Sequence, residues 1–266
     1  MDYNIAGQRV IVTAASKGLG RAVAQEFVDQ GATVVINSRS EENLEAAREH
    51  IEANVDGDGS VLIVPGDLSD PEVVIEVFDA AIDKLGGLDT LVTNHGGTTR
   101  RSFEKMTTEL LDETYESVIK STFLMVKKAL PALKESDGGS ITHIVSTSAR
   151  EPPRNHIPSN ILRLGIYGLS KSVSNEYGEY GVRSNCVGPR MVMTDRIASI
   201  FEDDAKRQGI SVEEAKSQHV DSLPLSRVGD PQEFAEAVAF LSSDAASFIT
   251  GTSLAIDGGW TNGAIL

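Results

Sequence analysis

The sequence predicts an α/β fold in which helices cover both faces of a parallel sheet. Short apolar runs typical of buried strands alternate along the chain with longer segments of helical periodicity. This alternation indicates crossover units, which set successive strands parallel to one another. The first apolar run breaks into small residues at 14–16, and Gly18 and Gly20 follow where a helical pattern begins. Because the 266 residues contain no linker and no internal repeat, we expect 1–266 to form a single domain.

Val and Ile recur in the apolar runs, and β-branched residues favour strands. Strands are therefore expected near residues 8–13, 32–37, 61–65, 89–93, 140–146, 182–187 and 253–256. The segments between them carry apolar residues at spacings of three and four, which is the period of an amphipathic helix. Helices are therefore expected near residues 19–30, 41–54, 71–84, 110–131, 159–179 and 231–242. Ligands of such sheets bind beyond the carboxyl ends of the strands, so we expect functional residues in the loops after each strand.

The formal charge of −15 argues against partners that need a basic surface, such as nucleic acid or an anionic membrane. No apolar run reaches the length of about 18 residues that a membrane span needs. Residues 1–4 lack the basic and apolar segments of a signal peptide. Cys186 is the only cysteine, which permits no internal disulfide and fits a reducing compartment. We expect a soluble, cytoplasmic protein that acts on a small molecule.

The segment from Val10 to Gly20 predicts a strand, a tight turn and the start of a helix. Small residues let the main chain approach a ligand, and the first amides of the helix carry the positive end of its dipole. Such a turn binds phosphate, although similar turns also occur in proteins without a ligand. The expected contacts to a dinucleotide here are Thr13, Ala15, Ser16, Lys17, Gly18 and Leu19.

Basic residues after the second strand favour NADP(H) over NAD(H). Ser38 and Arg39 follow that strand, where an acidic residue would bind the adenosine ribose hydroxyls and a basic one pairs with an added 2′-phosphate. Lys17 is basic too, although either charge alone is also compatible with a solvated surface. Asp67 and Leu68, after the third strand, are expected beside the adenine, with a turn or capping role as the alternative for Asp67.

The fourth strand ends in Asn94, His95 and Gly96, which we expect to face the same cleft. The amide of Asn94 can bridge two strand ends, and glycine lets a ring lie against the main chain. His95 has two interpretations, a structural histidine at a strand end or a ligand-facing one.

Several segments are similar to the short-chain dehydrogenase/reductase superfamily. Residues 13–20 resemble its cofactor turn, with Ala14 where the first glycine belongs, and 93–96 resemble its Asn-Asn-Ala-Gly strand end, altered at two positions. Matches that resemble the 3-oxoacyl-carrier-protein reductases lie at 224–229, 231–233, 240–244 and 256–259. The resemblance implies a Rossmann fold with a seven-stranded sheet, and a homotetramer or homodimer assembled through two long helices. The apolar stripe of the helix at 110–131 is wider than one sheet needs, which fits such an interface.

The family's chemistry uses a serine, a tyrosine, a lysine four residues after the tyrosine, and an asparagine on the preceding long helix. Tyr167 and Lys171 have the tyrosine-to-lysine spacing, but we expect this pair to be a false match. In the family the tyrosine follows the serine by a fixed interval, which leads from Ser146 to Ser159. Counting from Tyr167 instead would remove eight residues, more than two turns, from the following helix.

In the gapless match Ser159 holds the tyrosine position, Arg163 the lysine position and Val118 the asparagine position, so only Ser146 remains of the four. Arg163 is expected to hold the nicotinamide ribose through its planar guanidinium. Ser159 is a weaker acid and a shorter side chain than tyrosine. The proton is therefore expected from a water held by Ser146 and Ser159, or from His156, because histidine is a competent acid at neutral pH. His156 precedes Arg163 by seven residues, the separation that enoyl-carrier-protein reductases use, and its alternative role is that of a loop residue.

Pro189, Val192 and Thr194 follow the sixth strand, where the resemblance implies contacts to the cofactor. The polar segment 191–223 lies where family members close a lid over the substrate. Seven of the 14 arginines follow the fourth, fifth and sixth strands, namely Arg100, Arg101, Arg150, Arg154, Arg163, Arg190 and Arg196. They concentrate positive potential at the cleft and predict an anionic or acyl-type substrate, with solvated loop charges as the alternative.

These observations predict an NADP(H)-dependent oxidoreductase that interconverts a carbonyl and a hydroxyl with atypical proton delivery. No metal site is expected. Two alternatives stay open, a catalytically inactive protein that binds the cofactor and an enoyl-type reductase that uses His156.

Overall fold

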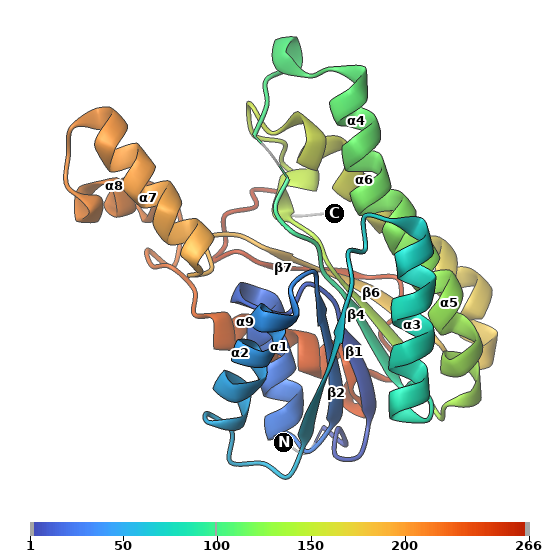
Figure 1. Ribbon diagram of the computed structural model, residues 1–266. Helices are drawn as coiled ribbons and strands as arrows, with labels where there is room; N and C mark the ends of the chain where they lie inside the picture. The colour runs from blue at the N-terminus through green and yellow to red at the C-terminus, as the bar shows by residue number, and fades with distance from the viewer. Residues whose placement is uncertain (1–2, 99, 264–266) are drawn as a thin grey trace.

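The computed structural model describes residues 3–98 and 100–263, and its strands form one parallel sheet in the order β3-β2-β1-β4-β5-β6-β7 (Figure 1). The predicted α/β class and seven-stranded Rossmann sheet are confirmed. Residues 1–2, 99 and 264–266 of the expected single domain lie outside the described residues. The strands are β1 (Arg9–Val12), β2 (Thr33–Ser38), β3 (Ser60–Pro65), β4 (Thr90–Thr93), β5 (Ser140–Ile144), β6 (Arg183–Pro189) and β7 (Ser253–Ile256).

The strand β1 lies third in the sheet and pairs with both β2 and β4. The chain builds β2 and β3 on one side of β1 and then returns to add β4 to β7 on the other. Ligands of doubly wound sheets bind at such a reversal, beyond the carboxyl ends of the strands. The exits of β1 and β4 therefore mark where a dinucleotide is expected.

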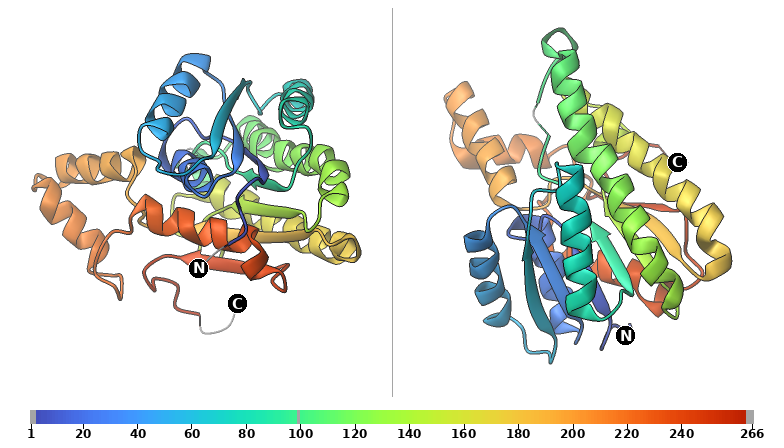
Figure 2. Two further views of the ribbon diagram at one scale, coloured as in Figure 1. Left: turned by 90° about the horizontal axis from the view of Figure 1, so that it is seen from below. Right: turned by 45° about the vertical axis from the view of Figure 1, so that its right-hand side comes forward.

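Helices cover both faces of the sheet (Figure 2). On one face α1, α2 and α9 bury Phe27, Leu44 and Phe234 in a single apolar cluster. On the other face Phe78 and Met125, from α3 and α5, belong to a second cluster, to which α6 also contributes. The helix bounds are α1 (Gly18–Asp29), α2 (Glu41–Glu52), α3 (Pro71–Leu85), α4 (Thr108–Tyr115), α5 (Ser121–Glu135), α6 (Ile157–Tyr177), α7 (Asp195–Gln208), α8 (Val212–Val220) and α9 (Pro231–Ser242). In the described ranges, no helix combines the length and the apolarity that crossing a bilayer requires.

The single helix expected at 110–131 is interrupted by a π-helical turn at Glu116–Lys120, between α4 and α5. A π-turn inserts one residue into the helix and alters its hydrogen-bond ladder. Side-chain hydroxyls bind the main chain there, because Ser121 donates to the Ser117 carbonyl at 2.9 Å and Thr122 donates to the Val118 carbonyl at 2.5 Å. The hydrophobic period alone does not reveal this turn, and such turns are frequent at functional sites.

The segment expected to form a lid contains α7 and α8, which project from the carboxyl edge of the sheet in all views (Figures 1 and 2). Thr194 is the N-cap of α7, and its hydroxyl accepts a hydrogen bond from the Ile197 amide at 3.4 Å. Phe201 and Ala215 are buried between the two helices, and His219 Nε2 lies 2.8 Å from Asp204 Oδ2. A helical pair with its own small core can move as a unit, and the lid role of 191–223 stays a prediction.

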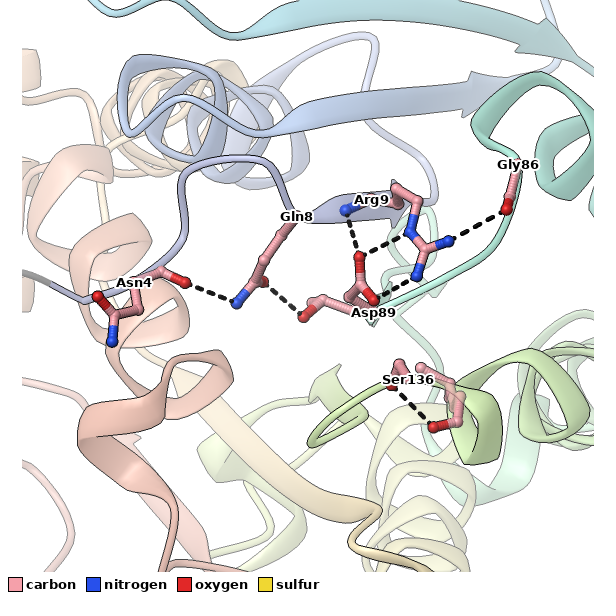
Figure 3. A network of polar contacts seen from close by, with 8 residues as sticks. Asn4, Gln8, Arg9, Gly86, Asp89 and Ser136 are labelled. Atoms are coloured by element: carbon pink, nitrogen blue, oxygen red, sulfur yellow. Dashed lines mark hydrogen bonds and ion pairs between the residues drawn. The ribbon is translucent and has the colours of Figure 1, made fainter.

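The opposite, amino-terminal edge of the strands is fastened by an ion pair between β1 and the loop before β4 (Figure 3). The Asp89 carboxylate accepts from the Arg9 amide at 2.8 Å and lies 2.7 Å from Arg9 Nη2. Gln8 extends the network, because its Oε1 accepts from Thr90 Oγ1 at 3.2 Å. This network holds the sheet together at the edge farthest from the candidate site.

Candidate active site

Thr13 and Asn94 join the exits of β1 and β4. The Thr13 hydroxyl donates to the Asn94 carbonyl and accepts from the Asn94 amide, both at 2.8 Å. The Asn94 side-chain amide donates to the Ala14 carbonyl at 3.2 Å. Asn94 therefore bridges two strand ends, as the sequence predicts, and fixes the floor of the site.

The turn between β1 and α1 leaves room for a ligand against its main chain. Ala14 adopts φ +48°, a left-handed conformation that costs L-residues about 1–2 kcal/mol. Gly20 has no space for a side chain, because a Cβ there would lie 2.5 Å from the Ala14 carbonyl oxygen. Lys17 sits at the N-cap of α1 without a side-chain capping bond, so the first amides of the helix stay available to a phosphate. Of the predicted contacts in this turn, Thr13 and Ala15 are buried, Lys17 is exposed, and Ser16, Gly18 and Leu19 are half-buried.

The predicted adenosine end lies at the exits of β2 and β3. Arg39 is exposed directly after β2, and the Ser38 carbonyl accepts from the Gly66 amide at 3.0 Å. Asp67 is exposed, and its Oδ1 accepts from the amide and the hydroxyl of Ser69 at 3.0 and 2.9 Å. Asp67 thus makes the turn that the sequence offered as its alternative role, while its second oxygen stays open. Leu68 packs against the core.

Ser146 and Ser159 lie at the exit of β5 and the start of α6, joined through Ser148. The Ser146 hydroxyl accepts from the Ser148 amide at 3.2 Å. The Ser148 and Ser159 hydroxyls are 3.1 Å apart, and both residues are buried. The two predicted serines are therefore brought together, with Ser148 as a link that the sequence analysis did not assign.

Arg163 lies one turn into α6 and faces the end of β5. Its Nη1 donates to the carbonyls of Ile144 and Val145 at 3.3 and 3.0 Å, and only 8% of the residue is exposed. Burial, with a smaller effect of the Arg196 charge, lowers the pKa of Arg163 to about 10. It stays protonated at neutral pH, so a fixed cation lies at the end of β5.

Tyr167 lies a further turn along α6 and faces β6 and β7. Its hydroxyl donates to the main-chain carbonyl of Ser146 at 3.3 Å, and the Arg150 guanidinium lies 5.9 Å from its ring centroid. Burial raises the pKa of this phenol. The phenol is therefore close to the main chain of Ser146, but it is a weaker acid than a free tyrosine and its hydrogen is engaged.

His95 contacts the helix directly after the π-turn, at Thr122. Its Nε2 lies 2.6 Å from the Thr122 hydroxyl, which itself donates to the Val118 carbonyl. Burial, and then the charge of Arg163, lower the pKa of His95 to about 3, so the ring is neutral. Because Thr122 has one hydrogen to donate, His95 Nε2 must be the donor in this pair. Sequence reasoning missed Thr122, and the only hint was the run of hydroxyl residues on this helix.

His156 stands at the N-cap of α6, three residues before Ser159, without a side-chain capping bond. Burial lowers its pKa, and the charges of Arg100, Arg196 and Arg190 lower it further. Three of the seven arginines that the sequence analysis singled out therefore act on the protonation of His156.

Three further arginines of the predicted cluster are Arg150, Arg154 and Arg101. The Arg150 guanidinium donates to the Ser253 carbonyl on β7, so it points away from the cleft that the sequence assigned to it. Arg154 is exposed, and Arg101 donates to the Arg100 carbonyl at 2.9 Å. The positive cluster of the cleft is therefore smaller than expected, and Arg150 does not belong to it.

The exit of β6 reaches the cofactor turn through Thr194. A Cβ at Gly18 would lie 3.6 Å from Thr194 Cγ2, so this loop flanks the turn. Val192 is buried and pairs with Gly229 in an isolated bridge, while Pro189 ends β6. Gly96, after β4, is exposed, and a side chain there would meet no atom within 4 Å. These predicted cofactor residues share the carboxyl edge of the sheet.

The fold and its carboxyl edge define a dinucleotide-binding protein of the Rossmann type. A family profile described as Enoyl-(Acyl carrier protein) reductase matches residues 13–261. The chain belongs to the short-chain dehydrogenase/reductase superfamily of oxidoreductases, as its motifs imply.

Relatives span nearly the whole chain. The NADPH-dependent reductase BacG of Bacillus subtilis is 32% identical over 248 residues, which are 93% of this chain and 95% of BacG. The 3-oxoacyl-[acyl-carrier-protein] reductase FabG of Vibrio cholerae is 30% identical over 259 residues, 96% of this chain and 98% of FabG. The solved structure of L-sorbose reductase from Gluconobacter frateurii with NADPH and L-sorbose has a TM-score of 0.93 at 25% identity, and covers 99% of this chain and 100% of its own.

Proposed function

We propose that the chain is an NADP(H)-dependent oxidoreductase that interconverts a carbonyl and a hydroxyl group on a small molecule. The observation that carries the proposal is the open turn at 14–20, with basic Lys17 and Arg39 beside it and no acidic residue directly after β2. A basic pair of this kind suits the 2′-phosphate of NADP(H). BacG and L-sorbose reductase, whose names or ligands include NADPH, support this choice. We place the protein in the cytoplasm, since its one cysteine is buried and free.

The residues at the exit of β5 have separate tasks in this reaction. Bound NADPH supplies a hydride to the carbonyl carbon, and a proton must reach the carbonyl oxygen. Arg163 uses one nitrogen for the strand end, which leaves its other N–H groups for ribose hydroxyls. The Ser146 hydroxyl accepts from the Ser148 amide, so its own hydrogen is free to bind and orient the carbonyl oxygen.

We assign the proton to His156. Tyr167 has a raised pKa and an engaged hydroxyl, and Ser159 has no partner that would make it acidic. An imidazolium whose pKa is lowered by burial and nearby arginines gives up its proton readily. A water held between Ser146 and Ser159 is the competing route.

Steady-state NADPH oxidation tests the proposal on a panel of ketones, oxoacyl thioesters and enoyl thioesters. With the best carbonyl substrate, Ser146→Ala and His156→Gln are each expected to lower kcat by about a hundredfold, the usual contribution of a positioned acid or its orienting group. Ser159→Ala is expected to change kcat little. If Ser159→Ala is as damaging as Ser146→Ala while His156→Gln is harmless, the water route is right and the assignment of His156 is wrong.

The pH profile gives an independent readout. Because the pKa of His156 lies below 6.5, carbonyl reduction by its protonated form should rise as the pH falls toward that pKa. His156→Gln should flatten this limb of the profile, whereas Ser159→Ala should keep it. A profile that is the same in the wild type and in His156→Gln would contradict the assignment.

In the alignment that we favour, three of the four tetrad positions are changed, so a catalytically inactive, cofactor-binding protein is the second candidate. That candidate predicts tight NADPH binding by calorimetry and no turnover on any member of the panel. Turnover on enoyl thioesters alone, lost in His156→Gln, would instead identify an enoyl-type reductase.

We also propose that the chain forms a homodimer or homotetramer through α4, α5 and α6. Tyr115, Phe123, Ile161 and Leu164 are large apolar side chains that are 47–57% exposed on these helices. Such a patch on neighbouring helices is typical of a subunit interface. Light scattering should give a multiple of the chain mass for the wild type and a smaller one for Ile161→Glu. A wild-type monomer would refute the proposed assembly.

A further inference from the structure

We propose that Arg100, Arg190 and Arg196 form a receptor for a carboxylate group of the substrate, placed beside His156. This inference rests on the proposed function and deepens it, because it names the substrate class as an anionic carbonyl compound. Arg100 and Arg190 lie in the loops after β4 and β6, and Arg196 lies in the first turn of α7.

The loop after β4 and the loop before α6 are tied together at His156. Arg101 and His156 form an isolated parallel bridge, and the Ile157 amide lies 3.3 Å from the Arg101 carbonyl oxygen. Arg100 directly precedes this bridge and is exposed. Its charge is the largest of the three arginine effects that lower the pKa of His156. The bridge therefore holds Arg100 close to the predicted proton donor.

Arg196 reaches the same region from α7. Its Nη2 donates to the Thr98 carbonyl at 3.1 Å. The guanidinium lies directly against Gly97, because a Cβ there would stand 0.9 Å from Arg196 Nη1. Arg196 thus spans from the lid to the loop after β4, and only a glycine at position 97 permits this approach.

Arg190 approaches from the exit of β6 and is held by stacking. Its guanidinium lies 3.5 Å from the ring centroid of Trp260, a cation–π contact that fixes the plane of the group. Its Nε is buried and has no hydrogen-bond partner among the described residues. A buried donor without an acceptor destabilises the fold, so such a group points to a water or ligand that satisfies it.

The protein's own carboxylates offset this cluster only in part: burial lowers the pKa of Arg190, and the charges of Asp257 and Glu151 act in the opposite direction. In residues 3–98 and 100–263, no carboxylate oxygen lies within 4.0 Å of the nitrogens of Arg100, Arg190 or Arg196. By contrast, Arg207, on the same helix as Arg196, pairs with Asp204 at 2.7 Å. The chain has 39 acidic and 24 basic residues, so acidic partners are plentiful. Burial, and then the charge of Arg100, lower the pKa of Arg196, and a bound anion would relieve this electrostatic cost.

Two anions could satisfy the cluster, a substrate carboxylate or a phosphate of the cofactor. The phosphate-binding turn and Arg39 follow β1 and β2, whereas Arg100 and Arg190 follow β4 and β6. These two strands flank β5, whose exit carries Ser146. The position on the Ser146 side favours the substrate, and the experiment below separates the two sources.

A carboxylate held there would also change His156. The groups that lower the pKa of His156 besides burial are Arg100, Arg196 and Arg190, and an anion paired with them would raise that pKa. The histidine would then be protonated more fully when a substrate is seated. Substrate charge and proton delivery are in this way coupled through one cluster.

The test is a titration of the NADP⁺-saturated protein with succinate, followed by the NMR signals of its histidine rings. The NMR signal of His156 is identified as the one that is missing from the spectrum of His156→Gln. A titration with chloride at equal ionic strength serves as the control for succinate. We expect the His156 signal to shift saturably and its titration midpoint to rise. Arg196→Gln should weaken succinate binding by about tenfold, the loss of one charge-assisted hydrogen-bonding partner. Arg207→Gln, an arginine of the same helix outside the cluster, should leave it unchanged.

Three results would overturn the inference. The first is succinate binding only in the absence of NADP⁺, which would assign the cluster to a cofactor phosphate. The second is a His156 signal that does not shift saturably with succinate. The third is an equal loss of succinate affinity in Arg196→Gln and Arg207→Gln. The readout does not need turnover. Succinate binding without activity on any carbonyl would therefore contradict the proposed function and support the anion receptor. Turnover of a carbonyl substrate without succinate binding would support the proposed function and contradict the anion receptor.

Discussion

Replacing Tyr167 by phenylalanine tests whether this tyrosine is a catalytic acid or a packing residue. The change removes one hydrogen bond, that of the phenol to the Ser146 carbonyl at 3.3 Å, and keeps the ring. A bond of this kind contributes about 0.5–1.5 kcal/mol to stability. In a domain of this size, that loss lowers Tm by about 1–6 °C.

The change in kcat distinguishes a catalytic acid from a packing residue more clearly than the change in Tm does. Loss of a general acid lowers the rate by about 10²–10⁴-fold. If Tyr167 only holds the main chain after Ser146, a small shift of that strand end should lower kcat by less than about threefold, which is less than 1 kcal/mol of barrier.

The assay is NADPH oxidation with the best carbonyl substrate, run beside thermal unfolding of the same preparations. Tyr180→Phe is a matched control, because that tyrosine is 47% exposed and lies after α6, outside the proposed interface. A hundredfold or larger loss of kcat in Tyr167→Phe, with Tm within the expected range, would refute our alignment of α6 and restore Tyr167 as the acid.

Three further predictions concern the cofactor turn and the sheet. In calorimetry, Arg39→Ala should raise the Kd for NADPH by about tenfold and leave the Kd for NADH unchanged, because only NADPH carries the 2′-phosphate. An equal rise of Kd for both cofactors would contradict the assignment of Arg39 to the 2′-phosphate. Ala14→Gly relieves a left-handed alanine and should raise stability by up to about 1 kcal/mol, as measured by urea unfolding, and a loss of stability would argue against the turn geometry. Burial raises the pKa of Asp89, but its bonds to Arg9 outweigh burial and hold that pKa below 3.8. Asp89 therefore stabilises the fold above this pH, and this effect is lost as the pH falls through its folded pKa. Asp89→Asn should lower the free energy of unfolding by about 1 kcal/mol at neutral pH. The difference from the wild type should disappear in acid.

The sheet could be predicted because its strands are continuous apolar runs, and the position of the site followed from the order of strand and helix. The bridge by Asn94 was expected for the same reason, since both partners sit at strand exits that the topology brings together. Asp67 was expected either beside adenine or in a turn, and its bonds to Ser69 show the turn.

Other features depend on contacts that the order of residues does not encode. The π-turn before α5 keeps the same apolar stripe as a regular helix, so periodicity missed it and the contact between His95 and Thr122. The direction of Arg150 is set by a carbonyl on β7, more than a hundred residues away in the chain. The position of Arg150 after β5 predicted a side chain in the cleft, but its contact with the distant strand β7 directs the side chain away from the cleft.

The central claim is that the reacting carbonyl meets Ser146 and His156 and that Arg163 binds the ribose. The Tyr167 hydroxyl stays bonded to the main-chain carbonyl of Ser146 and does not contact the substrate. A crystal structure of the NADP⁺ complex tests this most directly. We expect the reactive nicotinamide carbon to face the Ser146 hydroxyl and the His156 ring, with an Arg163 nitrogen within hydrogen-bond distance of the ribose. A nicotinamide whose reactive face is turned to the Tyr167 hydroxyl would contradict it.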